Sequence, residues 1–262
     1  MADYESLLWD HEGHVATITL NRPEKKNAIS RVMFDELRSA FDRASGDEEV
    51  RCVVVTGAGG AFCSGADLSD SRNLVSTPME GKARMAMVHS VVRSFIECRK
   101  PTIAKVTGVA AGADANLALG CDLIVASRAA SFAELFVKRG LVVDFGGTWA
   151  LSRILPLHKA KELAFLGEMI SAEEADRLGM LNRLCDDSEI DSVVKDYAER
   201  LASLPPRTME LLKENFNRAN ERSLVQNLDA ESIGQTMAFS TDDMREAVVA
   251  WLEKREPRFT GR

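Results

Sequence analysis

The sequence predicts an α/β protein in which strands, glycine-containing turns and helices alternate. Two stretches carry this pattern. Cys52-Val-Val-Val-Thr56 has the composition of a buried strand and leads into the glycines at 57–60, and an amphipathic helical pattern follows. The same order repeats where the strand-like run 102–106 leads into a turn at 108–112 and a short helical pattern at 113–119. This repetition favours a single core built from recurring strand, turn and helix units.

The flanking elements fit the same class. Val15–Leu20 alternates in polarity and ends at Asn21-Arg22-Pro23, as a strand does before a turn. Ser30 is positioned as the N-cap of a helix whose apolar residues recur up to Gly46. Beyond position 188 the pattern is almost wholly helical and is interrupted at Pro205-Pro206. We therefore expect a core over residues 1–197 and a helical region over 198–262.

Composition excludes several classes of protein. The chain has 262 residues, of which 45% are hydrophobic and 28% charged, and it has no run near the roughly 20 apolar residues that a membrane span needs. The net charge of -7 disfavours nucleic acid as a partner. The N-terminal residues show neither a secretory nor a mitochondrial signal, so we expect a cytoplasmic location and no membrane association. Five scattered cysteines and four histidines outside the motifs predict no disulfide framework and no metal site.

A glycine-rich turn after a strand can bind nucleotide phosphates, either through the dinucleotide fingerprint or as a P-loop. Residues 57–65 fail both tests, because Phe62 stands where the dinucleotide fingerprint needs glycine and Ala66-Asp67 follow where a P-loop needs Lys and Ser or Thr. Small residues let a ligand approach backbone N–H groups, and helix N-termini favour negative charge. Each turn alone is explained by simple chain reversal, whereas the two together indicate an oxyanion hole.

Several motifs resemble those of the enoyl-CoA hydratase/isomerase (crotonase) superfamily, in matching order and spacing. They are the segments Asn21–Ala28, Gly60–Leu68, Gly108–Asp122, Gly140–Trp149, Ile170–Ala175, Phe239–Asp243 and Lys254–Phe259. The resemblance thus covers nearly the whole chain. It implies a crotonase spiral of strand-strand-helix turns with a C-terminal helical trimerisation region, assembled as a homotrimer or a dimer of trimers.

The resemblance also implies a site for an acyl-CoA thioester, with coenzyme A as part of the substrate and no separate cofactor. The backbone amides of Ala66 and Ala113 would form the oxyanion hole. Residues expected around the substrate are Arg22, Lys26, Ala28, Asp67, Leu68, Gly112, Asn116 and Phe136, with Phe239 and Lys254 reaching the ligand of a neighbouring subunit.

The expected chemistry departs from that of the best-known members. Hydratases of the family carry glutamates at the positions of Asn116 and Phe136, and neither of these side chains can exchange a proton. Asp144 lies among apolar neighbours in the loop that the family folds over the acyl group, where desolvation raises the pKa of a carboxyl group. One such carboxylate can remove a proton from one carbon and return it to another. The context of Asp144 most resembles ring-epoxyphenylacetyl-CoA isomerases and related enoyl-CoA isomerases.

Alternatives remain for three acids. Asp144 could instead cap the helix that begins near Gly146. Asp114 stands where the family usually has glycine, and we expect it to accept amide hydrogens in the first turn of its own helix, or else to line the acyl pocket. Glu134 precedes the lost glutamate position by two residues, and strand alternation predicts that it points elsewhere.

We therefore predict an enzyme that isomerises unsaturated acyl-CoA, with Asp144 as the proton shuttle. Hydration of an enoyl-CoA is the alternative, and it would require Asp144 and Asp114 to hold a water molecule together. A non-catalytic acyl-CoA-binding protein is the third possibility.

Overall fold

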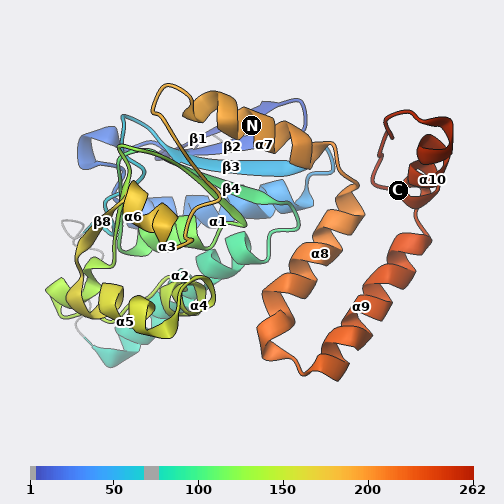
Figure 1. The fold of residues 1–262 in the computed structure, drawn as a ribbon. Coiled ribbons are helices and arrows are strands. Elements are labelled where there is room, and N and C mark those ends of the chain that lie inside the picture. Colours follow the sequence, from blue (N-terminus) through green and yellow to red (C-terminus); the bar gives the residue numbers. More distant parts are fainter. Residues whose placement is uncertain (1–3, 68–76) are drawn as a thin grey trace.

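The computed structural model describes residues 4–67 and 77–262. A six-stranded sheet forms its centre, with the strands in the order β1-β2-β3-β4-β6-β9 (Figure 1). Only β1 and β2 are antiparallel, and the other neighbours in this sheet are parallel. The strands are β1 (Leu7–Glu12), β2 (Val15–Leu20), β3 (Cys52–Gly57), β4 (Thr102–Val106), β6 (Leu123–Ser127) and β9 (Arg183–Cys185).

A smaller sheet gives the fold its repeating unit. It consists of β5 (Val109–Ala111), β7 (Ser131–Ala133) and β8 (Met169–Ser171), in that order. Each of β4 and β6 in the large sheet is followed directly by a strand of the small sheet and then by helical structure. The predicted strand-strand-helix units are therefore confirmed.

Helices cover both faces of the large sheet. On one face lie α1 (Arg31–Gly46), α2 (Pro78–Ile96) and α3 (Ala113–Leu119), and on the other lies α7 (Ile190–Ala202) (Figure 1). Ser30 caps α1 as predicted, because its hydroxyl accepts a hydrogen bond from the Met33 amide at 3.2 Å. The remaining core helices are the 3-10 turns η1 (Pro23–Lys25) and η3 (Leu135–Arg139), with α4 (Gly147–Ile154), α5 (Leu157–Leu166) and α6 (Ala172–Arg177).

The C-terminal region consists of helices, as predicted. They are α8 (Pro206–Arg218), η4 (Ala219–Glu221), α9 (Leu224–Phe239) and α10 (Asp242–Glu253). The expected boundary between residues 197 and 198 falls inside α7 and stays a prediction. Val194, Ala198 and Ala202 of that helix pack together against the sheet.

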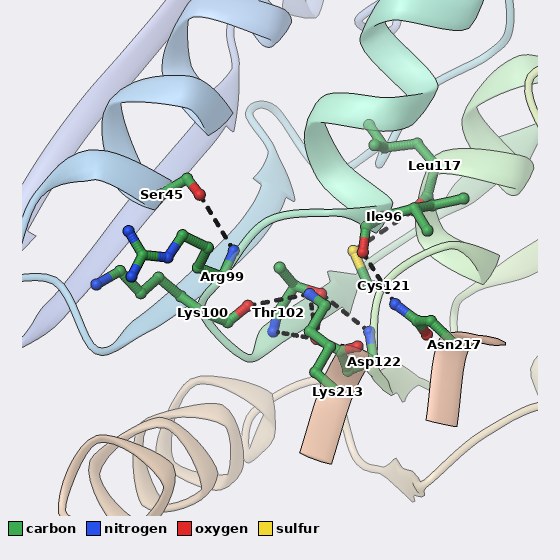
Figure 2. Close-up of polar contacts among 10 residues, drawn as sticks. All are labelled: Ser45, Ile96, Arg99, Lys100, Thr102, Leu117, Cys121, Asp122, Lys213 and Asn217. Atoms are coloured by element: carbon green, nitrogen blue, oxygen red, sulfur yellow. Dashed lines mark hydrogen bonds and ion pairs between the residues drawn. The ribbon is translucent and has the colours of Figure 1, made fainter. Parts of the chain in front are cut away.

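A polar network fixes α8 to the core (Figure 2). The Lys213 ammonium donates to the Lys100 carbonyl at 3.0 Å and forms an ion pair with Asp122 at 2.7 Å. The same Asp122 carboxylate accepts from the Thr102 amide at 2.7 Å, and Asn217 donates to the Ile96 carbonyl. Since the Lys213 side chain is 8% exposed, these contacts are largely shielded from solvent and hold α8 firmly. None of the helices in the described part of the chain could cross a membrane.

Candidate functional site

The two glycine turns lie directly beside each other. The Cys63 amide donates to the Val109 carbonyl at 2.9 Å, and the Ala111 amide donates back to the Cys63 carbonyl at 3.0 Å. Past this pair, Gly65 (φ 105°) and Gly112 (φ 62°) adopt conformations that only glycine takes easily. A Cβ atom added to Gly112 would lie 3.9 Å from Gly65 Cα, so the turns approach backbone to backbone.

The amides of Ala66 and Ala113 follow these glycines. Ile29 pairs with Ala66 in a parallel bridge through the Gly65 carbonyl and the Asp67 amide, which leaves the Ala66 N–H pointing away from Ile29. Ala113 is the first residue of α3, so its N–H has no acceptor within the helix. Neither amide donates a hydrogen bond within residues 4–67 and 77–262. The arrangement can therefore present two N–H groups to a ligand oxygen.

Several residues expected to contact coenzyme A gather next to Ala66. Arg22 forms an ion pair with Asp67 at 2.9 Å and donates to the Ala28 carbonyl at 2.6 Å. The Lys26 carbonyl accepts from the Ser64 amide at 3.0 Å, which lays the two loops against each other. Leu68, the remaining residue of this predicted group, lies outside the described residues.

Asn27 organises this corner and was not among the predicted residues. Its side-chain amide donates to the carbonyls of Ala58 and Ala61, both at 2.8 Å, and its side-chain oxygen accepts from the Arg22 amide. Asn27 is fully buried and has φ 58°. Asparagine tolerates this left-handed conformation better than most residues, and that preference was the available signal in the sequence.

Asp144 lies in the loop between η3 and α4, half-buried, with no hydrogen bond to its carboxylate from the described residues. Gly146 rather than Asp144 is the N-cap of α4, and no side chain caps that helix, so the capping interpretation is wrong. Burial raises the pKa of Asp144, and the positive charges of Arg84 and His89 on α2 oppose the increase. The sequence had indicated no role for these two residues.

Phe145 anchors this loop. Its side chain is buried, and its ring lies 5.5 Å from that of Phe95 and 5.8 Å from that of Phe34. Its φ of 54° is unusual for a bulky residue. Phe145 is therefore fixed in the core, whereas the neighbouring Asp144 is only half-buried.

The Asn116 side chain holds the loop that carries Asp144. Its side-chain nitrogen donates to the Asp144 backbone carbonyl at 2.9 Å and approaches Glu134 Oε2 at 3.4 Å. Gly147 packs so closely on Asn116 that an added Cβ atom would lie 2.3–2.4 Å from its side-chain atoms. Phe136 is buried, and its ring faces Gly112 of the second turn. The two positions that carry glutamates in hydratases thus support the loop and the turn.

Glu134 is buried in the same cluster, which overturns the predicted outward orientation. The strand β7 ends at Ala133, so the alternation stops before Glu134, whose side chain turns inward to Asn116 and is 3% exposed. Burial raises the pKa of Glu134 to about 8, and the negative charge of Asp144 adds to the increase.

Asp114 is wholly buried, and the expectation that it serves its own helix is wrong. Its Oδ2 accepts a hydrogen bond from the Gly65 amide at 2.8 Å, across the gap between the two turns. Burial raises the pKa of Asp114 to about 7, although the Cys63 thiol and the Gly65 amide oppose this.

Phe239 and Lys254 do not meet this site within one chain. They lie at the ends of α9 and α10, on the far side of the molecule from α3 (Figure 1). Their expected role across a subunit boundary stays a prediction. No group of three or more metal-binding side chains occurs among the described residues.

Comparison with known proteins supports one family throughout. The family model for enoyl-CoA hydratase/isomerase matches residues 10–262. The 1,2-epoxyphenylacetyl-CoA isomerase of Escherichia coli K12 is 40% identical, with 98% of this chain and 99% of that protein covered. The short-chain-enoyl-CoA hydratase of Clostridium acetobutylicum is 33% identical, with 97% of each covered. Among solved structures, an enoyl-CoA hydratase from Mycobacterium smegmatis superposes with a TM-score of 0.91 at 33% identity, covering 97% of this chain and 98% of that one.

Proposed function

We propose that this chain, which belongs to the enoyl-CoA hydratase/isomerase family, moves a carbon–carbon double bond along the acyl chain of an unsaturated acyl-CoA. The observation that carries the proposal is the state of Asp144. Its half-buried carboxylate has no hydrogen-bond partner among the described residues, while its backbone is held by Asn116. A carboxylate in this state is available to a substrate carbon.

In the proposed reaction Asp144 acts twice. With a 3-enoyl thioester, its carboxylate removes a proton from C2, and the electron pair spreads over the dienolate to the thioester oxygen. The protonated Asp144 then returns the proton to C4, and the double bond is left between C2 and C3. Atoms balance without water or a redox partner, since the same side chain accepts and donates one proton.

The N–H groups of Ala66 and Ala113 would stabilise the oxygen of the dienolate. One such donor typically contributes about 2.7–4 kcal/mol to the transition state. Both N–H groups lie at the adjoining turns and lack acceptors of their own among the described residues, which supports this role. The nearby Arg22, Lys26, Ala28 and Asp67 are then suited to the coenzyme A portion of the substrate.

We further propose that copies of the chain associate through the C-terminal helices. The main neighbours of α9 are α8 and α10, yet large apolar side chains remain exposed around it. Exposed apolar patches on a protein surface commonly mark sites of protein–protein contact. The exposed apolar residues of this region include Leu224, Val225, Leu228, Ile233, Met237, Val248, Trp251 and Leu252.

Hydration of an enoyl-CoA is the second candidate function. The position of Glu134 favours it, with Glu134 in place of Asp114 as the partner of Asp144. Asp114 is engaged by the Gly65 amide and fully buried, so it is poorly placed to orient water. Glu134 instead turns toward Asn116 beside the Asp144 loop and could act as a second carboxyl group.

Product analysis in water enriched in oxygen-18 separates the two activities. The purified protein is given a 3-enoyl-CoA or a 2-enoyl-CoA of matched length, and products are identified by mass spectrometry. We expect interconversion of the two substrates with no heavy oxygen in the product. A 3-hydroxyacyl-CoA that carries oxygen-18, formed without any shift of the double bond, would establish hydration in its place.

A further inference from the structure

Asp114 connects the two glycine turns through one buried hydrogen bond. It follows Ala113 directly in α3, and its Oδ2 accepts from the amide of Gly65, which directly precedes Ala66. The residues joined are thus the sequence neighbours of both proposed oxyanion donors. The side chain is fully buried, and the bond is 2.8 Å long.

The backbone alone does not hold the turns together at this point. The last backbone hydrogen bonds that join the two turns are those between Cys63 and the strand β5, which end at Ala111. Beyond them, Gly112 donates to Ala133, and the Gly65 carbonyl accepts from Ile29, so each turn is bound to a different part of the protein. The Asp114 side chain is the connection that spans from one to the other.

The ordinary explanations for a buried aspartate do not account for it. Asp114 does not cap its helix, since the N-cap is Gly112 and no side chain caps α3. No cation pairs with it in the described part of the chain. Keeping an unpaired carboxyl group buried is costly, so its bond to a single backbone amide calls for a functional reason.

We infer that Asp114 is a positioning residue that sets the separation of the Ala66 and Ala113 N–H groups. The inference rests on the proposed function, in which these groups bind the thioester oxygen. If the Gly65 amide loses its acceptor, the first turn can shift relative to α3, and the two donors no longer converge on one oxygen.

The charge state of Asp114 affects the same site. The groups that face it are the Cys63 thiol and Gly65 amide of the first turn and the Asp144 carboxylate across the site. Protonated Asp114 still accepts the Gly65 hydrogen bond, whereas ionised Asp114 places a negative charge next to the forming dienolate. We therefore expect kcat to decline at alkaline pH as Asp114 ionises.

The test compares Asp114→Asn, which keeps an acceptor without a charge, with Asp114→Ala, which removes it. For Asp114→Ala we expect kcat to fall about tenfold to a hundredfold with KM changed less than about threefold, since one misplaced donor costs at most what its removal would. Asp114→Asn should restore most of kcat and should lack the alkaline decline. Equal kcat values for wild type and Asp114→Ala, or an alkaline decline that persists in Asp114→Asn, would overturn the inference.

A spectroscopic measurement keeps this test separate from the identity of the reaction. A saturated acyl-CoA with carbon-13 in the thioester carbonyl is bound to each variant, and its NMR shift and infrared stretch report hydrogen bonding to the oxygen. We expect the bound carbonyl of the wild type and Asp114→Asn to be polarised, and that of Asp114→Ala to be less so. This result would support the positioning role even if the isomerase proposal failed. Identical carbonyl signals in all three proteins would refute it even if isomerisation occurred.

Asp243 provides a matched control for loss of a buried carboxylate. It is 2% exposed and accepts hydrogen bonds from the backbone amides of Thr260 and Gly261 in the C-terminal region. Asp243→Ala should lower the melting temperature while leaving the kcat of the folded fraction and the carbonyl signal unchanged. A loss of kcat as large as that of Asp114→Ala would show that the effect is not specific to the turns.

Discussion

We propose that Asp144 is the reactive residue of the site, because its backbone is held in place while its carboxylate accepts no hydrogen bond from the described residues. The Asn116 side chain holds the Asp144 carbonyl by a hydrogen bond, and the next residue, Phe145, is packed in the core. Partial burial raises the pKa of Asp144, which strengthens it as a base, and the nearby Arg84 and His89 limit the increase. A base of this kind works only when it is ionised, so activity must fall as pH drops through its pKa.

Replacing Arg84 should move that pH dependence. Arg84→Gln removes a positive charge that favours ionised Asp144, so the pKa of Asp144 rises and the acidic decline of kcat shifts to higher pH. A pH profile of kcat measures the shift. Arg93→Gln, in the same helix but not among the groups that influence Asp144, should leave the profile in place. A shift to lower pH in Arg84→Gln would contradict this electrostatic account.

Glu134 should make folding stability depend on pH. Its pKa is raised from 4.5 to about 8 in the folded state, so between these values the native protein binds the proton that the unfolded chain releases. Its stabilising contribution is complete below pH 4.5 and is lost as pH rises toward 8. Glu134→Gln keeps an acceptor for Asn116 and cannot ionise, so denaturant titrations at pH 5 and about 8 should differ less than in the wild type. An unchanged or larger difference would mean that Glu134 is already ionised when folded.

The start of α4 and the middle of α3 fit together only because residue 147 is glycine. Gly147→Ala would bring a Cβ atom within 2.3–2.4 Å of Asn116 and push that side chain away from the Asp144 carbonyl. We expect a kcat loss of roughly tenfold or more and a destabilisation of about 1–3 kcal/mol from overpacking. Kinetics and thermal unfolding check both effects.

Gly46 supplies the control for this substitution. It ends α1, and no atom lies within 4 Å of a Cβ added there. Gly46→Ala should therefore leave kcat unchanged and stabilise the fold slightly, by about 0.5–1 kcal/mol. If both alanine variants lost activity equally, the contact with Asn116 would not be the cause.

For the whole molecule, the exposed apolar surface of the C-terminal helices predicts self-association. Ile233 is 64% exposed on α9, and Ile233→Glu would place a charge in the proposed interface. Sedimentation equilibrium should give a mass above one chain for the wild type and a smaller mass for Ile233→Glu. Leu157→Glu, at an exposed apolar position on α5, should keep the mass of the wild type. A wild-type chain that sediments as a monomer would rule out the association.

The sequence was sufficient for what depends on local pattern. Periodicity and capping located β2, α1 and α3, and the repeated glycine turns indicated two adjoining backbone donors. It was insufficient where a side chain's partner is distant along the chain. The bond from Asp114 to Gly65 spans 49 residues and the inward turn of Glu134 depends on where β7 stops, so neither follows from spacing. The packing of α7 against the large sheet is likewise a contact between distant parts of the chain, and the helical pattern alone does not reveal it.

Hydrogen exchange between substrate and solvent shows directly whether Asp144 moves the proton. Wild type and Asp144→Asn are incubated with a 3-enoyl-CoA in deuterated water, and deuterium at C2 and C4 is followed by NMR, with binding measured separately by calorimetry. We predict that the wild type shifts the double bond and introduces deuterium, while Asp144→Asn binds with similar affinity and does both at least a hundredfold more slowly. If Asp144→Asn exchanged and isomerised at the wild-type rate, another group would be the base.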